Sequence, residues 1–261
     1  MKQISSESSF VWKQILFIIT LPFLFIQILI GKKPISAAFI PFRDFFLFVI
    51  EAKMTFLLIL VNVIVFIYEL YVNMAFESLV FKPEHLIELQ FMPIIASWFL
   101  HANVLHLAGN MLFLFIFGRV VERNLGSGKF LLIYFGSAII SSVLSGLLGQ
   151  GGIGASGAIA GVISAAILIQ PFYLTYLIIG IPLPIIAVGW LAILGDITGI
   201  IVPKNDNIGH FAHLGGYLAI TIILFLLNKT EKNKMKKGFM LNIAFVILIG
   251  ILYYLGIIQI M

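Results

Sequence analysis

Cysteine is absent from the 261 residues of this chain, and charged residues make up only 10% of them. The absence of cysteine excludes disulfide bonds and thiolate metal sites, and it leaves the redox environment of the protein open. A soluble domain carries about a quarter charged residues, so this chain has too little charge to cover its surface in water. Because 61% of the residues are hydrophobic, the sequence predicts that lipid surrounds most of the protein.

Long runs of like charge are also missing, although the net charge is +5. No basic stretch is long enough to suggest a nucleic-acid surface, so we expect the lipid bilayer as a partner and no nucleic acid. A cleavable signal peptide is not expected either. The apolar run 15–30 is followed by Gly31-Lys32-Lys33-Pro34 and not by a small-residue cleavage site.

Apolar segments divide the chain into an N-terminal apolar helix and seven expected membrane spans. The N-terminal run 15–30 has a length between that of a short span and that of an interfacial helix. The expected spans are 54–72, 94–117, 130–148, 155–169, 176–200, 210–227 and 238–258. Pro182 and Pro184 are expected to kink the fifth span. The sequence therefore predicts an all-α polytopic membrane protein with three parts: a membrane-associated segment (1–53), a six-span core (54–228), and a basic cytoplasmic loop with the seventh span (229–261).

Two segments rich in basic residues, 118–129 and 229–237, set the expected orientation. An even number of spans separates them, so they lie on the same side of the membrane. Basic residues in short loops favour the cytoplasmic side, which puts Ser156, at the start of the fourth span, near the outer face. That span has about 15 residues, or roughly 22 Å of helix, against a hydrocarbon core of about 30 Å. Its start is therefore expected in a depression that water enters.

A small set of polar residues lies within the apolar spans, where each is costly without a partner and is a functional candidate. The set comprises His101, Asn103, His106, Asn110, Ser156, Asp196, His210 and His213. His106 and Asn110 are four residues apart and share one helix face, so they offer a pair of hydrogen-bond donors to an oxyanion. We interpret His101 as a structural residue of the outer loop and Asp196 as a solvated or capping residue.

Small residues predict which of these groups meet. Gly157 and Gly161 form a G-x-x-x-G pattern in the fourth span, and small residues also flank His213 in the sixth. Because small residues let membrane helices approach closely, these two spans are expected to pack together and to set Ser156 against His213.

The expected chemistry is that of a serine nucleophile with a histidine base. An adjacent imidazole activates a serine hydroxyl. No carboxylate is expected where it could orient His213, which indicates a Ser156–His213 dyad and not a triad. His210, three residues earlier, is the alternative base. The histidines are expected to lack carboxylate or thiolate company, so no metal and no other cofactor is predicted.

Four motifs on these spans resemble those of the rhomboid intramembrane serine proteases. Gly154-Ala155-Ser156-Gly157 resembles the GxSG motif, His101-x4-His106-x3-Asn110 the second-span motif, the Ala-His-Leu-Gly-Gly run at 212–216 the sixth-span motif, and 122–129 the turn after the second span. The resemblance covers about residues 54–228 and implies a six-helix rhomboid core.

This resemblance also implies an activity and roles for individual residues. The implied activity is hydrolysis of peptide bonds in or near the transmembrane segments of membrane proteins, which would be the substrates. Ser156 is the implied nucleophile and His213 the implied base, while His106, Asn110 and the Ser156 backbone N–H form the implied oxyanion hole. Ala160 stands where some members carry an aromatic residue that packs on the catalytic histidine, so other contacts must hold His213.

Two other functions remain open at this point. A catalytically silent rhomboid-like protein would bind membrane clients, but such relatives usually lack the serine or the histidine, and this chain keeps both. A small transporter would use the intramembrane polar cluster as a substrate or proton site, but it predicts inverted repeats, and none is found in the sequence. We expect a multi-pass protein of a prokaryotic plasma membrane, with its oligomeric state left open.

Overall fold

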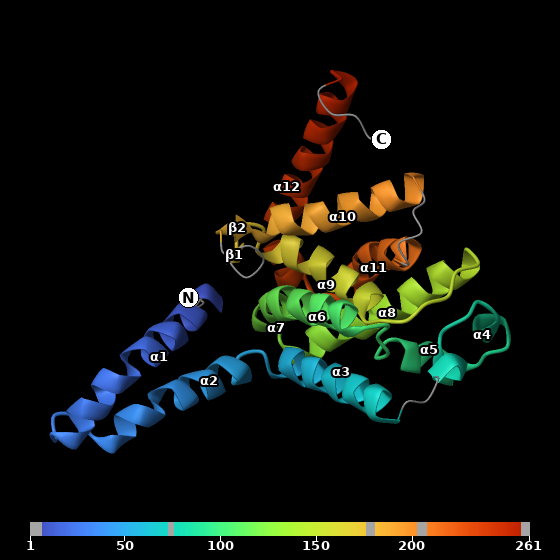
Figure 1. Ribbon diagram of the computed structural model, residues 1–261. Coiled ribbons are helices and arrows are strands. Elements are labelled where there is room, and N and C mark those ends of the chain that lie inside the picture. Colours follow the sequence, from blue (N-terminus) through green and yellow to red (C-terminus); the bar gives the residue numbers. More distant parts are fainter. Residues whose placement is uncertain (1–6, 73–75, 176–180, 203–207, 257–261) are drawn as a thin grey trace.

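The computed structural model describes residues 7–72, 76–175, 181–202 and 208–256, and helices dominate this part of the chain (Figure 1). The α-helices are α1 (Glu7–Leu29), α2 (Ile40–Ile50), α3 (Lys53–Val72), α4 (Glu84–Ile87), α5 (Phe91–Ser97), α6 (Val104–Phe113), α7 (Arg119–Leu125), α8 (Ser127–Leu147), α9 (Ser156–Ile169), α10 (Ile185–Ile201), α11 (His210–Ile223) and α12 (Lys229–Tyr254). Shorter elements are the 3-10 turns η1 (Ile35–Phe39), η2 (Phe76–Leu79) and η4 (Leu224–Leu226), the π-helical turn η3 (Leu114–Gly118), and strands β1 (Leu174–Thr175) and β2 (Leu183–Pro184).

Within the described residues, five helices are long and apolar enough to cross a membrane. They are Trp12–Leu29, Lys53–Tyr71, Val104–Leu125, Ser127–Leu147 and Lys229–Tyr254. Three shorter apolar helices, α9, α10 and α11 with η4, complete the bundle. The expected fold class, an all-α polytopic membrane protein, is confirmed, and the first, third, fourth and sixth expected spans match α3, α8, α9 and α11 closely.

Helix α9 forms the centre of the bundle. Every residue from Gly157 to Ile169 is buried, and α9 contacts α6, α7, α8, α10, α11 and α12. Its sequence is apolar or small on all sides, which is typical of a helix enclosed by other helices. Helices α1 and α2, in contrast, are not enclosed by other helices and extend away from the bundle as a pair (Figure 1).

The second span begins later and ends later than the expected segment 94–117. Asn103 caps α6, because its side chain accepts a 2.9 Å hydrogen bond from the His106 backbone N–H. The helical path then continues through η3 and α7 to Leu125 and stops at Gly126, whose φ is +85°. A positive φ favours glycine and ends a helix. His101 therefore precedes the second span, and Arg119 lies inside it and not in a turn.

The fifth span is shorter than the expected segment 176–200, and the expected proline kink is wrong. β1 and β2 pair antiparallel, Leu174 with Pro184 and Thr175 with Leu183, and α10 starts only at Ile185. Pro182 and Pro184 precede the helix, where a residue without a backbone N–H breaks no intrahelical bond. Residues 176–180 of the expected span lie outside the described residues.

The prediction of a basic loop at 229–237 is also wrong, because these residues form the first turns of α12. Asn228 and Glu231 form a capping box, with hydrogen bonds of 3.0 Å and 2.9 Å between each side chain and the other residue's backbone N–H. Glu231 also forms an ion pair with Lys129, and Lys234 donates a 2.7 Å hydrogen bond to the Asn124 carbonyl. The two basic segments thus lie side by side, as expected for segments on one side of the membrane.

Glu122 joins the start of α3 to the junction of α7 and α8. Its carboxylate accepts hydrogen bonds from the backbone N–H of Met54 (3.0 Å) and of Thr55 (2.8 Å). It also accepts from the hydroxyls of Thr55 (2.8 Å) and Ser127 (2.7 Å). Glu122 is only 3% exposed, so this carboxylate replaces water for four donors. A negative charge at the start of a helix is also favoured by the helix dipole.

We predict that Glu122→Ala destabilises the fold by about 3 kcal/mol, because each buried donor left without a partner costs about 1–3 kcal/mol. The melting temperature of the purified protein in detergent measures this loss. Glu77→Ala is the matched control, since Glu77 is exposed in η2. Equal melting temperatures for the two variants would contradict the role given to Glu122.

Candidate active site

A cavity of about 1280 Å³ lies between α6, α9, α10 and α11. Nearly all the polar residues selected from the sequence line it: Asn103, His106, Asn110, Ser156, Asp196, His210 and His213. Tyr217, which the sequence analysis did not select, lines it as well. His101 does not line the cavity; its ring centroid lies 5.1 Å from that of His106, and its Nδ1 is 3.1 Å from the Phe99 carbonyl oxygen.

The backbones of α9 and α11 touch beside this cavity. A Cβ atom on Gly161 would lie 3.0 Å from the Gly216 carbonyl oxygen, and one on Gly216 would collide with the Gly157 carbonyl. The expected packing of the fourth and sixth spans through small residues is therefore confirmed. Ser156 is the first residue of α9, and His213 lies one helical turn before Gly216, so both residues flank this contact.

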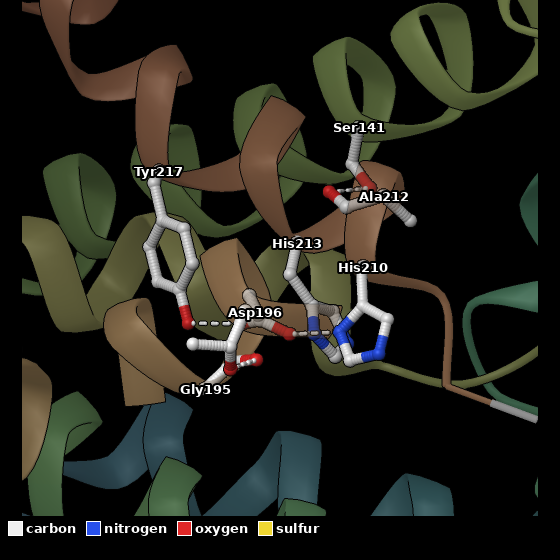
Figure 2. A network of polar contacts seen from close by, with 8 residues as sticks. Ser141, Gly195, Asp196, His210, Ala212, His213 and Tyr217 are labelled. Atoms are coloured by element: carbon white, nitrogen blue, oxygen red, sulfur yellow. Dashed lines mark hydrogen bonds and ion pairs between the residues drawn. The ribbon is translucent and has the colours of Figure 1, made fainter. Parts of the chain in front are cut away.

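The opening residues of α11 are also fixed from α8. The Ser141 hydroxyl donates a 2.7 Å hydrogen bond to the Ala212 carbonyl (Figure 2). A Cβ on Gly157 would meet both the Ser141 side chain and, at 3.5 Å, the same Ala212 carbonyl oxygen. Helices α8, α9 and α11 thus meet at one point, immediately next to His213.

The loop that leads into α9 is held from both sides. The backbones of Phe81 and Gly152 exchange hydrogen bonds of 3.2 Å and 2.9 Å, and the Gly154 N–H donates to the Ser97 carbonyl at 2.8 Å. Gly154 has φ of +118°, and a Cβ there would lie 2.7 Å from His106 Cε1. Only glycine fits this backbone conformation so close to a ring. The loop before Ser156 therefore runs against His106.

His106 and Asn110 present hydrogen-bond donors on this wall. The Ala102 N–H donates to His106 Nδ1 at 3.4 Å, so a neutral imidazole carries its proton on Nε2. A Cβ atom built on Gly154 would lie 2.9 Å from that Nε2 atom and 3.5 Å from Asn110 Nδ2. Asn110 Nδ2 is buried and has no acceptor among the described residues. Both donors are thus held beside the Gly154 backbone, next to Ser156 in the sequence.

Asp196 does not behave as a solvated or capping residue, and that expectation is wrong. Figure 2 shows its carboxylate between the side chains of α11: Oδ1 is 2.7 Å from His213 Nδ1 and 2.8 Å from His210 Nδ1. The other oxygen accepts a 2.8 Å hydrogen bond from the Tyr217 hydroxyl. Asp196 is 8% exposed. The expectation that no carboxylate could orient His213 is wrong for the same reason.

The same three residues are the ones that could hold a metal ion. Ligand atoms of Asp196, His210 and His213 lie within 4.8 Å of one another. The expectation that no carboxylate lies near the histidines is therefore wrong. Two nitrogen or oxygen ligands of one tetrahedral zinc ion are roughly 3.3 Å apart. The observed nitrogen–oxygen separations of 2.7 Å and 2.8 Å are those of direct hydrogen bonds. This geometry fits a hydrogen-bonded cluster better than a metal site.

Residues 88–230, just over half of the chain, match the family model of the Rhomboid domain. The chain belongs to the rhomboid family. The matched segment contains every residue that lines the cavity except Phe81.

Curated relatives carry the same family name. "RHOMBOID-like protein 12, mitochondrial" of Arabidopsis thaliana is 33% identical over 143 residues, which are 47% of this chain and 42% of the relative. "Rhomboid protease GluP" of Bacillus subtilis (strain 168) is 37% identical over 122 residues, 46% and 24% of the two chains. "Rhomboid-like protein 11, chloroplastic" of Arabidopsis thaliana is 28% identical over 145 residues, 52% of each. This rhomboid therefore spans about half or less of the length of these relatives.

We predict that Gly216→Ala lowers the melting temperature in detergent by about 5 °C, because overpacking a helix contact costs about 1–3 kcal/mol. Gly250→Ala in α12 is the matched control, since a Cβ there meets nothing within 4 Å. It should leave the melting temperature unchanged or raise it slightly. A Gly216 variant as stable as the control would argue against the close contact of α9 and α11.

Proposed function

We propose that this rhomboid is an intramembrane serine endopeptidase that hydrolyses peptide bonds in or near the transmembrane segments of membrane proteins. Ser156 is the nucleophile and His213 the general base. The observation that carries this proposal is that both residues line one cavity beside the backbone contact of α9 and α11. The matching relative from Bacillus subtilis, which is named a rhomboid protease, supports the same reaction class.

His213 is suited to be the base because its Nδ1 faces Asp196. With the proton on Nδ1, the Nε2 atom keeps its lone pair and accepts the proton of the Ser156 hydroxyl. The serine oxygen then bonds to the carbonyl carbon of the scissile peptide. The protonated His213 gives its proton to the leaving amine, and an acyl-enzyme forms. Water, deprotonated by His213, hydrolyses this ester and regenerates the Ser156 hydroxyl.

Three donors would stabilise the oxyanion of this reaction. His106 Nε2–H and the Asn110 amide come from α6, and the third is the backbone N–H of Ser156. Ser156 is the first residue of α9, so its N–H has no intrahelical acceptor and lies at the positive end of the helix dipole. Preorganised donors of this kind are worth a few kcal/mol each in the transition state.

The short central helix gives the site access to water. Helix α9 has 14 residues, or about 21 Å, whereas the hydrocarbon core is about 30 Å thick. Its N-terminus would therefore lie below the membrane surface. The cavity wall above it includes Gln150 and the backbone of Gly151 and Gly152, polar groups that would hold the hydrolytic water.

The remaining parts of the chain are placed around this core. We propose residues 54–228 as the six-span protease core, residues 1–53 as a membrane-associated addition, and 229–261 as a C-terminal addition that contains α12. Transmembrane proteins are the proposed substrates. The prokaryotic plasma membrane stays a prediction, because the names of the relatives include mitochondrial and chloroplastic proteins of a plant as well as a bacterial protease.

Replacement of Ser156 by alanine should abolish cleavage of a single-span test substrate, because no other group would supply the attacking oxygen. Purified protein in detergent or in proteoliposomes, with product bands quantified on gels, measures this loss. Ser164→Ala is the matched control, since Ser164 is buried in the same helix outside the cavity, and it should keep at least about half of the activity.

The same pair of variants separates the alternatives. A fluorophosphonate should label the wild-type protein and Ser164→Ala but not Ser156→Ala. A catalytically silent client-binding protein, or a transporter, would show neither labelling nor cleavage that depends on Ser156. Undiminished cleavage by Ser156→Ala would reject the enzyme proposed here.

Replacement of Asn110 by alanine should lower kcat by about 10²–10³-fold, the usual effect of removing one oxyanion donor. The effect on KM should be small, because the donor acts mainly in the transition state. Initial rates over a range of substrate concentrations measure both constants. Asn124→Ala, in α7 and outside the cavity, is the control. Equal kcat values for the two variants would remove Asn110 from the oxyanion hole.

A further inference from the structure

We infer that Asp196 is a positioning residue for His213, so that Ser156, His213 and Asp196 act as a triad instead of the dyad that the sequence predicts. This inference rests on the proposed function of Ser156 and His213. It starts from a feature that sequence reasoning did not find: a buried carboxylate from α10 that meets three side chains of α11.

The contact between Asp196 and His213 has the geometry that a base needs. The 2.7 Å separation joins Oδ1 to Nδ1, the ring nitrogen that the reaction does not use. A hydrogen bond there selects the Nδ1–H tautomer and fixes the plane of the ring. Nε2 is then left as the acceptor for the proton of Ser156.

Tyr217 holds the carboxylate in place from its other oxygen. Its hydroxyl donates at 2.8 Å to Asp196 Oδ2, and Tyr217 follows His213 by four residues on the same face of α11. The carboxylate therefore bridges two successive turns of one helix. Both carboxylate oxygens are satisfied, which is the condition for keeping a charge inside a membrane-embedded bundle.

His210 shares Oδ1 with His213 but faces a different neighbour. A Cβ on Gly199 of α10 would collide with His210 Nε2, so the Nε2 edge of this ring lies against the backbone of α10. His213 instead follows Ala212, whose carbonyl marks the meeting point of α9 and α11. We assign His213 as the base and His210 as a second donor that holds the Asp196 carboxylate.

Asp196 also acts on the charge that forms during the reaction. When the Ser156 proton moves to Nε2, His213 becomes an imidazolium next to the Asp196 carboxylate. The attraction between them is stronger inside the bundle than in water. The carboxylate stays ionised throughout, and the proton passes from the imidazolium to the leaving amine.

The test compares wild type, Asp196→Asn and Asp44→Asn in the full-length protein. Asparagine keeps the size of the side chain and can still accept from the ring, but it lacks the charge. We expect Asp196→Asn to lower kcat by about 100-fold, with KM changed by less than about threefold. The rate of Ser156 labelling by a fluorophosphonate should fall in parallel. Asp44 is solvent-accessible in α2, and its variant should match wild type.

A purely structural Asp196 would change the melting temperature or KM and leave kcat of the folded fraction unaltered. That result, or an Asp196→Asn variant with wild-type kcat, would overturn the inference. If Ser156→Ala is inactive while Asp196→Asn is fully active, only the triad is rejected. If Ser156→Ala cleaves normally, the proposed function itself is rejected.

A measurement on the unaltered protein avoids any question of folding. Nitrogen NMR of protein labelled with ¹⁵N-histidine reports which ring nitrogen carries the proton, with His213→Gln used for assignment. The triad requires His213 to be protonated at Nδ1 and bare at Nε2 in the neutral form. The opposite tautomer would overturn it.

Discussion

The close approach of α9 and α11 is the constraint on which the site depends. In lipid, apolar side chains gain little by leaving their solvent, so tight packing of small residues has to hold helices together. Gly157, Gly161 and Gly216 let the two backbones touch, and Ser141 of α8 ties the same region by bonding the Ala212 carbonyl. A larger side chain at any of these glycines would separate the helix that carries Ser156 from the helix that carries His213.

Three charged groups inside the bundle, Glu122, Asp196 and Arg119, are matched by partners. Glu122 accepts four hydrogen bonds at the end of one span, and Asp196 meets three side chains at the cavity. The Arg119 guanidinium lies 3.3 Å from the centre of the Phe48 ring and donates to the Phe48 carbonyl. Because an unmatched charge is expensive in this environment, these groups fix helix positions as well as serving any chemistry.

Much of this arrangement could be predicted from the sequence, for identifiable reasons. The helices α3, α8, α9 and α11 coincide with apolar runs bounded by charged or glycine residues, so their limits were found within a few residues. The approach of α9 and α11 could be predicted because glycines at helical spacing indicate a helix face that packs closely on another helix. The candidate residues of α6, α9 and α11 were selected because polar residues are rare in lipid-embedded segments, and they line one cavity.

The wrong sequence predictions fall where local backbone hydrogen bonds set the ends of a helix, or where the rotation of a helix sets the direction of a side chain. Helix α6 starts where Asn103 caps it, and α12 starts at the capping box of Asn228 and Glu231. Hydropathy alone does not predict either start. Strand β2, which pairs with β1, lies in an apolar run whose composition predicts a helix. Asp196 was misjudged because the direction in which it points depends on the rotation of α10 against α11, and no pattern within α10 reveals that rotation.

The central claim is that Ser156 and His213 act together in one cavity. A hydrophobic peptide chloromethyl ketone tests it most directly, because its carbonyl is attacked by the serine while its methylene alkylates the nearby imidazole and chloride leaves. Mass spectrometry of the digested protein should find the alkyl group on His213, and it should be absent when Ser156 is replaced by alanine. Alkylation of His210 instead, or of His213 at an equal rate without Ser156, would contradict the account.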